Sequence, residues 1–419
     1  MGRFSNPRSA IPGDAEYCYT QRLPGYFRHA SGRVDPKPMI ESISYRDFHT
    51  KVRDVWSSKR LPGYGMIEVT RRCPLNCVHC YNNLPLRDEE NARRELATAE
   101  HIRIIDELAE AGCLWLTYTG GEIFGRGDFL DIYTHAKKKG LLVILFTSGT
   151  LITPRIADHL ATWRPYAVEI TIYGSTRETH ESVTRVPGSY DKCMRAVRLL
   201  CERKIQISLK TIVLTLNQHE IEQMKDLVEK DLGLNFRIDP MVTPRLDFSQ
   251  RPLSFRVPAR TVVDLEMSDP KQAAGWKDLA REFGGCFPAL HPKQELYYCK
   301  AGINGFGIDA YGGMNLCLFS PGGKYDLRGG SFKDGWEGAL LAERSRKVSR
   351  ATKCLGCSVR HLCGSCPPNG ELEHGDPETP AAFYCEVAHL RARALGVEAK
   401  PHGECQYCLQ IHGGDISAR

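Results

Sequence analysis

From residue 64 to about residue 245, the sequence alternates between segments typical of β-strands and segments typical of α-helices. Short runs of apolar and β-branched residues predict six strands, at 66–70, 114–119, 142–147, 167–172, 206–213 and 236–239. Stretches with helical periodicity predict helices at 98–111, 128–139, 190–204 and 220–231, with Thr98 as the N-cap of the first helix. Strands that alternate with helices of this length favour a parallel sheet with right-handed crossovers.

Three cysteines follow the first predicted strand in a C-x3-C-x2-C arrangement, at Cys73, Cys77 and Cys80. Three thiolates this close in sequence can surround one metal centre, but they supply only three ligands. A structural zinc site needs four protein ligands, whereas a redox or catalytic site can leave one position open. The cysteines lie on the loop that leaves a strand, where barrel enzymes place their chemistry. Taken alone, the spacing also fits half of a zinc module.

A second motif, Gly120-Gly121-Glu122, ends the second predicted strand. Glycines at a strand end allow a backbone to approach a ligand closely, and Glu122 adds a hydrogen-bond acceptor. Together with the cysteine spacing of the preceding strand, this motif resembles the radical S-adenosylmethionine (radical SAM) enzymes. The resemblance implies an α/β fold, namely a partial (β/α)6 TIM-like barrel.

In the radical SAM family, the three cysteines hold a [4Fe–4S] cluster whose remaining iron binds SAM, and the Gly-Gly-Glu motif binds the amino group of its methionine portion. The reduced cluster cleaves SAM, and the resulting 5′-deoxyadenosyl radical abstracts a hydrogen atom from the substrate. A reducing partner such as flavodoxin or ferredoxin is therefore implied. The protein would align the radical with the target bond and exclude water.

Other family positions match more loosely. Ser148 ends the third predicted strand where relatives often carry Asn, and Thr171 is the candidate hydroxyl for SAM on the fourth strand. Thr184 stands where relatives carry Arg, so Arg185, one place later, is the candidate for the SAM carboxylate, with a surface role as the alternative. Asn217 is a weaker candidate for a SAM contact, since an Asn after a strand is commonly part of a turn.

The C-terminal third carries a second cysteine pattern that resembles the SPASM domain of peptide- and protein-modifying radical SAM enzymes. Its cysteines are Cys299, Cys317, Cys354, Cys357, Cys363, Cys366 and Cys385, with Gly312 between the first two. The family usually spaces the last close pair by three residues, whereas two separate it here. A zinc ribbon is the alternative for paired C-x2-C motifs. The resemblance implies two auxiliary iron–sulfur clusters.

The spacing divides these cysteines into two groups. Cys354, Cys357 and Cys363 can share one cluster with Cys385 as fourth ligand, while Cys366 joins Cys299 and Cys317. The fourth ligand of that other cluster is left open between Cys286, one of Cys405 and Cys408, and no protein ligand. The tail around Cys405 and Cys408, with His402 and His412 nearby, fits a small zinc site or an unstructured tail equally well. Cys18, Cys113, Cys193 and Cys201 are interpreted as core or surface residues.

The predicted function is modification of a peptide side chain, with a cross-link on a ribosomally made precursor peptide as the expected product. Cys/Ser oxidation, as in the sulfatase-maturing branch, and maturation of a peptide-derived redox cofactor are the alternatives. That branch carries an Asp base after the second SPASM cysteine, but Leu318 stands here and cannot accept a proton. Asp309 or Asp239 could substitute for it. A non-catalytic zinc-binding scaffold is the alternative from a different class.

Composition fits an ordinary globular protein, with 42% hydrophobic and 25% charged residues and a formal charge of +6. No basic block indicates nucleic-acid binding, and no signal peptide or membrane span is predicted, so a cytoplasmic location is expected. The expected division is an N-terminal extension (1–62), a radical SAM core (63–250), a linker (251–285), a SPASM domain (286–400) and a cysteine-containing tail (401–419).

Overall fold

The computed structural model describes residues 45–283 and 294–409. Its main sheet has nine strands in the order β11-β10-β9-β1-β4-β5-β6-β7-β8. Their bounds are β1 (Tyr64–Thr70), β4 (Trp115–Gly120), β5 (Leu142–Thr147), β6 (Ala167–Thr171), β7 (Ile207–Ile212), β8 (Asn235–Asp239), β9 (Gly305–Ile308), β10 (Gly313–Asn315) and β11 (Tyr325–Asp326). A separate pair joins β2 (Arg72–Cys73) to β3 (Leu84–Pro85).

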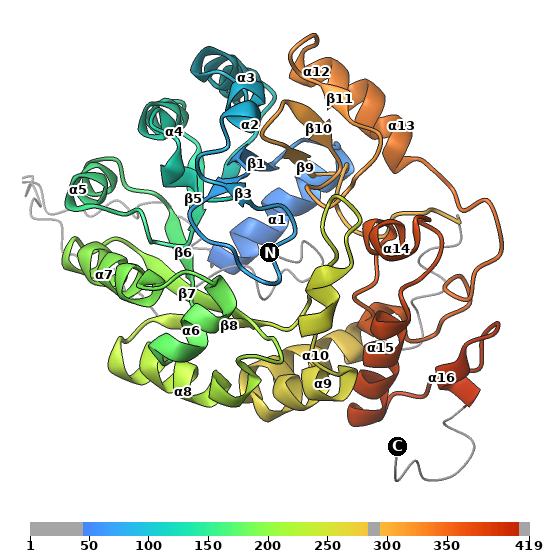
Figure 1. Ribbon diagram of the computed structural model, residues 1–419. Helices are drawn as coiled ribbons and strands as arrows, with labels where there is room; N and C mark the ends of the chain where they lie inside the picture. The colour runs from blue at the N-terminus through green and yellow to red at the C-terminus, as the bar shows by residue number, and fades with distance from the viewer. Residues whose placement is uncertain (1–44, 284–293, 410–419) are drawn as a thin grey trace, which may run out of the picture.

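The six strands predicted from the sequence are confirmed as β1 and β4 to β8, each within two residues of its expected bounds. They pair in parallel in chain order, so their carboxyl ends meet at one edge. This gives the α/β fold with the mostly parallel sheet of a partial barrel. Figure 1 shows the sheet curving around the centre of the molecule with helices along its outside.

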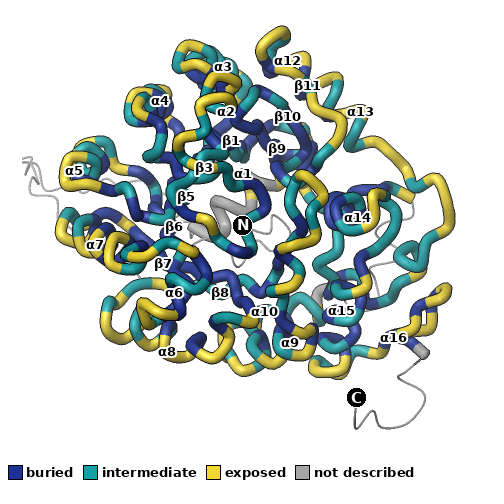
Figure 2. Tube along the Cα trace, viewed as in Figure 1, coloured by how far each residue is buried: buried dark blue, intermediate teal, exposed yellow. Residues whose placement is uncertain are grey.

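The outer helices cover the sheet with apolar faces. They are α3 (Thr98–Glu110), α4 (Phe129–Lys138), α5 (Pro154–Thr162), α6 (Arg177–Thr184), α7 (Ser189–Glu202) and α8 (Ile221–Asp226), the last flanked by η2 (Gln218–Glu220) and η3 (Leu227–Asp231). In α3, Ile104, Ile105 and Leu108 are fully buried in the main core. In Figure 2, buried dark blue segments lie mainly in the central strands and exposed yellow segments on the outer sides of the helices, because only one stripe of each helix packs inward.

The expected N-cap of α3 was wrong by one position. Thr98 is the first helical residue, and Ala97 takes the N-cap place with an extended backbone. The side chain of Glu100 accepts a hydrogen bond from the Ala97 amide at 2.6 Å, which supplies the capping contact that alanine lacks. The Thr98 hydroxyl instead donates to Asp128 at 2.5 Å and so ties α3 to the start of α4.

The sheet does not end with the six predicted strands. β9 pairs in parallel with β1, and β10 pairs antiparallel with both β9 and β11. Residues 305–326, which the sequence assigned to the cysteine-rich region, thus extend the barrel sheet. The division of the chain into domains stays a proposal.

The remaining elements lie before the sheet and beyond β8. They are α1 (Tyr45–Ser58), α2 (Glu89–Arg94), η1 (Ile123–Gly125), η4 (Arg251–Phe255), α9 (Ala259–Ser268), α10 (Pro270–Phe283), α12 (Phe332–Asp334), η5 (Gly335–Ala339), α13 (Leu340–Arg344), η6 (Arg360–Leu362), α14 (Pro367–His374), α15 (Ala382–Ala394) and α16 (Gln406–Leu409). α9 packs against α15, where the fully buried Arg391 makes two 2.6 Å hydrogen bonds to Glu266. In the described residues, no helix has the length and apolar character needed to cross a membrane.

Candidate active site

The loop that carries Cys73, Cys77 and Cys80 leaves the carboxyl end of β1, as the sequence predicted. All three cysteines are half-buried and free of disulfide bonds. The loop is fixed to the last turn of α6, because the amides of Asn76 and Val78 donate to the carbonyls of Thr184 and Val183 at 3.0 Å. The cysteine loop is therefore held between two elements of the barrel.

The three thiols interact with one another. Burial raises the pKa of each of them, and the pKa of Cys73 is raised further by Glu122, Cys77 and Cys80. The Leu75 amide donates to the Cys73 sulfur at 3.4 Å. Neighbouring thiolates repel one another, and a bound metal centre relieves that repulsion. The donor set fits the iron–sulfur cluster that the resemblance implies, and amide donors to sulfur influence its potential.

The glycines of the Gly-Gly-Glu motif approach the protein's own backbone. A Cβ on Gly120, whose φ is +138°, would lie 2.1 Å from the Thr70 carbonyl oxygen, and one on Gly121 would lie 2.4 Å from that of Arg72. The Gly121 amide donates to Thr70 at 2.7 Å and the Glu122 amide to Arg72 at 3.0 Å. The end of β4 is thus joined to the start of the cysteine loop, and only glycine fits this contact.

Glu122 is completely buried at the end of β4. Its carboxylate accepts hydrogen bonds from the Ser148 amide (2.8 Å), the Thr147 hydroxyl (2.6 Å), the Phe124 amide (3.3 Å) and the Ser148 hydroxyl. Burial raises the pKa of Glu122, whereas these hydrogen bonds lower it. The four donors fill about four acceptor positions of a carboxylate. Glu122 therefore organises the ends of β4 and β5 around itself.

The other predicted SAM contacts are placed less closely together. Thr171 ends β6, so it lies at the same sheet edge as Glu122 and Ser148. Arg185 follows α6 with φ of 59° and is exposed, while Thr184 beside it is buried and contacts the Ser189 hydroxyl at 2.7 Å. Asn217 is buried and bonds to Leu214, Thr211 and Ile212, which is turn chemistry.

The sequence motifs did not predict a group of charged residues that meets inside the barrel. Lys210 on β7 donates to Glu169 on β6 at 3.1 Å, and Arg237 on β8 donates to the same carboxylate at 2.7 Å. The Lys210 ammonium also lies 3.2 Å from the centre of the Phe146 ring. Charged residues at inward positions of otherwise apolar strands were the available signal.

A small cavity opens beside the cysteine loop. It has a volume of about 280 Å³, and Cys77, Cys80, Asn83, Arg245 and Arg251 are among its lining residues. Arg245 donates to the Cys80 carbonyl at 3.1 Å and to the Asn83 side chain at 2.7 Å. The segment after β8 thereby covers the cysteine loop and supplies positive charge there. A single arginine in a loop gives no signal in the sequence.

The cysteines of the C-terminal region affect one another's pKa values. Burial raises the pKa of Cys366, and Cys317, Cys299 and Cys363 raise it further. Burial also raises the pKa of Cys317, and Cys299 adds to that shift. Burial raises the pKa of Cys385 to about 12, and Cys363 and Cys354 contribute to the shift. Cys405 also raises the pKa of Cys354 and of Cys385. Cys286 lies outside the described residues.

Two residues considered as alternative bases are held in place by other contacts. Asp309 accepts from the Tyr311 and Gly313 amides at 2.9 Å and from Lys324 at 2.7 Å. Asp239 accepts from the Met241 amide at 3.0 Å. Leu318 is buried. Asp309 thus serves mainly to bind the β9–β10 connection and Lys324.

The sequence of this chain is similar to those of known proteins. Residues 67–228 match the family model of the Radical SAM superfamily. The chain is 25% identical over 339 residues to the AdoMet-dependent heme synthase of Methanosarcina barkeri, covering 76% of this chain and 95% of that protein. It is 27% identical over 313 residues to the mycofactocin maturase MftC of Mycobacterium tuberculosis, covering 71% and 76%.

The fold is also similar to that of a solved structure, Streptococcus suis SuiB bound to its precursor peptide SuiA. The TM-score is 0.57 at 15% sequence identity, with 84% of each chain covered. The protein is therefore a radical SAM enzyme with structural similarity to a peptide-binding maturase. The class implies a SAM-binding [4Fe–4S] cluster and SAM itself as cofactors.

Proposed function

We propose that this enzyme modifies a side chain of a peptide, with a cross-link in a ribosomally made precursor peptide as the product. The observation that carries the proposal is the presence of two further groups of cysteines beyond the cysteine loop. Two auxiliary clusters of the SPASM type would accept the electron that leaves the substrate or bind its sulfur. Similarity to MftC and to SuiB over most of the chain supports this choice.

Each group of residues at the site would have a separate role. Cys73, Cys77 and Cys80 would hold the catalytic cluster, and bound SAM would supply the radical that removes a hydrogen atom. Glu122 and Ser148 would shape the edge where SAM lies, with Gly120, Gly121, Thr171 and Arg185 as its further neighbours. Arg245 would cover the cysteine loop and limit access of water from that side.

The auxiliary ligands would be shared between two clusters. Cys354, Cys357, Cys363 and Cys385 would hold one cluster, and Cys299, Cys317 and Cys366 the other. This grouping is supported by the effects of Cys363 and Cys354 on the pKa of Cys385 and by those of Cys317 and Cys299 on the pKa of Cys366, to which Cys363 adds a smaller effect. Leu318, adjacent to Cys317, leaves no carboxylate at that position, which disfavours Cys/Ser oxidation of the sulfatase-maturing kind.

A second candidate is a tetrapyrrole substrate. It is favoured by the match to AdoMet-dependent heme synthase, which spans 95% of that protein. A cofactor-maturation role is the further alternative, in line with the similarity to mycofactocin maturase.

The test compares these substrates directly. Anaerobically reconstituted enzyme, SAM and a reductant are incubated with short peptides encoded beside the gene or with an iron–coproporphyrin, and the products are analysed by mass spectrometry. A cross-link removes two hydrogen atoms from the peptide per event, without added oxygen and with 5′-deoxyadenosine formed alongside. Conversion of a peptide cysteine to an aldehyde would promote the oxidation alternative, and turnover of the porphyrin alone would overturn the peptide proposal.

A further inference from the structure

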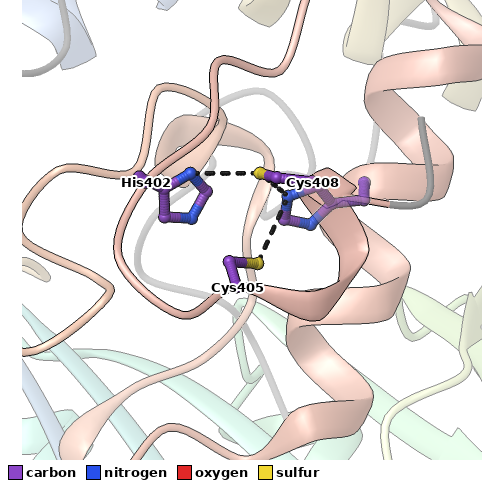
Figure 3. Close-up of side chains that lie close together, drawn as sticks. His402, Cys405 and Cys408 are labelled. Carbon is purple, nitrogen blue, oxygen red and sulfur yellow. Dashed lines mark hydrogen bonds between the residues drawn. The ribbon is translucent and has the colours of Figure 1, made fainter. Parts of the chain in front are cut away.

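Four metal-binding side chains come together near the C-terminal end of the described chain, away from the cysteine loop. They are His389, His402, Cys405 and Cys408, and their ligating atoms all lie within 4.8 Å of one another. In the part of the chain that the structure describes, no other three His, Cys, Asp or Glu side chains converge closely enough to hold one ion. In Figure 3, the His402 ring and the sulfurs of Cys405 and Cys408 lie close together.

Three ligand–ligand distances lie close to the edges of a tetrahedron around one ion, two of them slightly shorter. Cys408 Sγ lies 3.1 Å from His389 Nε2 and 3.2 Å from His402 Nδ1, and Cys405 Sγ lies 3.7 Å from His389 Nε2. Bonds of about 2.3 Å to sulfur and about 2.0–2.1 Å to nitrogen give tetrahedral edges of about 3.3–3.8 Å. A four-iron cluster binds each ligand on a different iron atom and needs a wider spacing.

The surroundings orient the ligands and exclude water. Nδ1 of His389 lies 2.7 Å from the Cys385 carbonyl, which leaves Nε2 directed at the two sulfurs. All four residues are buried, and Cys405 and Cys408 are each only 1% exposed. The two imidazoles stack with their centres 5.7 Å apart. The Lys400 carbonyl lies beside two of the ligands: the Cys408 thiol donates to it at 3.4 Å, and His402 Nδ1 lies 2.9 Å from it.

We propose that His389, His402, Cys405 and Cys408 form a closed structural zinc site that is separate from the iron–sulfur clusters. Two neutral imidazoles and two thiolates in a tetrahedral set are the ligands of structural zinc, and the set leaves no open position for substrate. The binding of zinc displaces the thiol protons of Cys405 and Cys408, so the ion replaces weak contacts with metal–ligand bonds.

The position of the site indicates what it stabilises. His389 lies on α15 one turn after Cys385, and a Cβ on Gly356 would lie 3.6 Å from the His402 Cβ. The Lys400 amide donates to the Ser358 hydroxyl at 2.9 Å. The zinc would therefore fasten residues 400–408 to the loop that carries Cys354 and Cys357, and would brace the second auxiliary cysteine group.

The test measures zinc and iron separately in the full chain, purified without chelators from zinc-supplemented cells. We expect about one zinc per chain by mass spectrometry of the metals, in line with a single four-ligand site. The variants His389→Gln and Cys405→Ser/Cys408→Ser should lose zinc at least tenfold and still form 5′-deoxyadenosine. Cys201→Ser, a change at an exposed cysteine, is the matched control and should keep its zinc.

A zinc-edge X-ray absorption spectrum of the wild-type enzyme provides evidence that does not depend on the folding of variants. Two sulfur neighbours at about 2.3 Å and two nitrogen neighbours at about 2.0–2.1 Å are expected. Absence of zinc from the wild type, or a shell of four sulfurs or of oxygens alone, would overturn the proposal. Iron instead of zinc lost from the His389→Gln variant would do the same. These readouts do not depend on which substrate the enzyme modifies.

Discussion

Ser148 donates to the buried carboxylate of Glu122 through both its backbone amide and its hydroxyl, and so joins the ends of β5 and β4. Glu122 in turn follows the glycines whose backbone contacts the strand that carries the cysteine loop. Three neighbouring strand ends are thus linked, β5 to β4 through the Glu122 carboxylate and β4 to β1 through the backbone amides of Gly121 and Glu122. The site that the sequence motifs indicated as two separate pieces is one hydrogen-bonded unit.

The first prediction concerns this carboxylate. Glu122→Gln keeps the shape but removes the charge, and a hydrogen bond to a charged group contributes about 1.5–3 kcal/mol. We expect the KM for SAM to rise about tenfold or more, since about 1.4 kcal/mol corresponds to a factor of ten. Ser148→Ala, which keeps the amide donor, should have a smaller effect. Equal KM values for Glu122→Gln and the wild type, measured by 5′-deoxyadenosine formation, would contradict this role.

The second prediction concerns the cysteine loop. Replacing Cys73, Cys77 and Cys80 together with alanine should abolish formation of 5′-deoxyadenosine, because no thiolates are left to hold the catalytic cluster. Iron bound by the C-terminal cysteines should be retained. The measurements are product formation under reducing conditions and iron content after reconstitution. Continued SAM cleavage by the triple variant would show that the catalytic cluster lies elsewhere.

The third prediction concerns the iron content. Three four-iron clusters give about 12 iron per chain, and Cys354→Ala/Cys363→Ala should lose about four of them. SAM cleavage in the absence of substrate should persist, since the cysteine loop is unchanged. Cys113→Ala, a change in the barrel core, is the control and should keep all of its iron. Zinc in both C-terminal groups of the wild type, without iron, would favour a metal-binding scaffold.

The fourth prediction concerns the buried ion pair between α9 and α15. Arg391 also donates to the Leu362 carbonyl at 2.7 Å, next to Cys363. Loss of one partner of a buried pair costs about 3–5 kcal/mol, so Glu266→Gln should lower the Tm by several degrees. Arg177→Ala breaks an exposed pair with Asp191 and should cost about 0–1 kcal/mol. Calorimetry of anaerobic protein compares the two variants, and similar Tm values would refute the prediction.

The fifth prediction is a pH dependence. Burial lowers the pKa of Lys210 to about 8, although Glu169 opposes the shift, from an ordinary value of 10.5. Between these values the unfolded chain binds more protons than the folded chain, so the contribution of Lys210 to the free energy of unfolding rises with pH. The Tm difference between wild type and Lys210→Met should therefore shift in favour of the wild type from about pH 7 to about pH 9.5.

Lys225 provides the control for this pH effect. Its hydrogen bond to Asp269 raises its pKa, so both folded and unfolded forms stay protonated across the same window. The Tm difference between wild type and Lys225→Met should then be constant between these pH values. A parallel shift in both variants would mean that another group titrates.

The six parallel strands could be predicted from the sequence because their apolar runs are local signals. β9 could not, since its four residues, Gly305–Ile308, carry two glycines and pair with β1, far away in the chain. The cysteine motifs were visible by spacing, whereas Glu169, Lys210 and Arg237 meet only when three strands come together. His389 gave no signal either, because its partners His402, Cys405 and Cys408 reach it only through the fold.

The pairing of β9 with β1 has a consequence for shortened forms of this enzyme. β1, which leads into the cysteine loop, lies between β4 and β9, so it is an interior strand only when residues 305–308 are present. A fragment that stops near residue 250 would leave one side of β1 with unpaired amides and carbonyls, and such edges favour association between chains. We expect an isolated barrel to aggregate, even though it would hold every residue of the catalytic motifs.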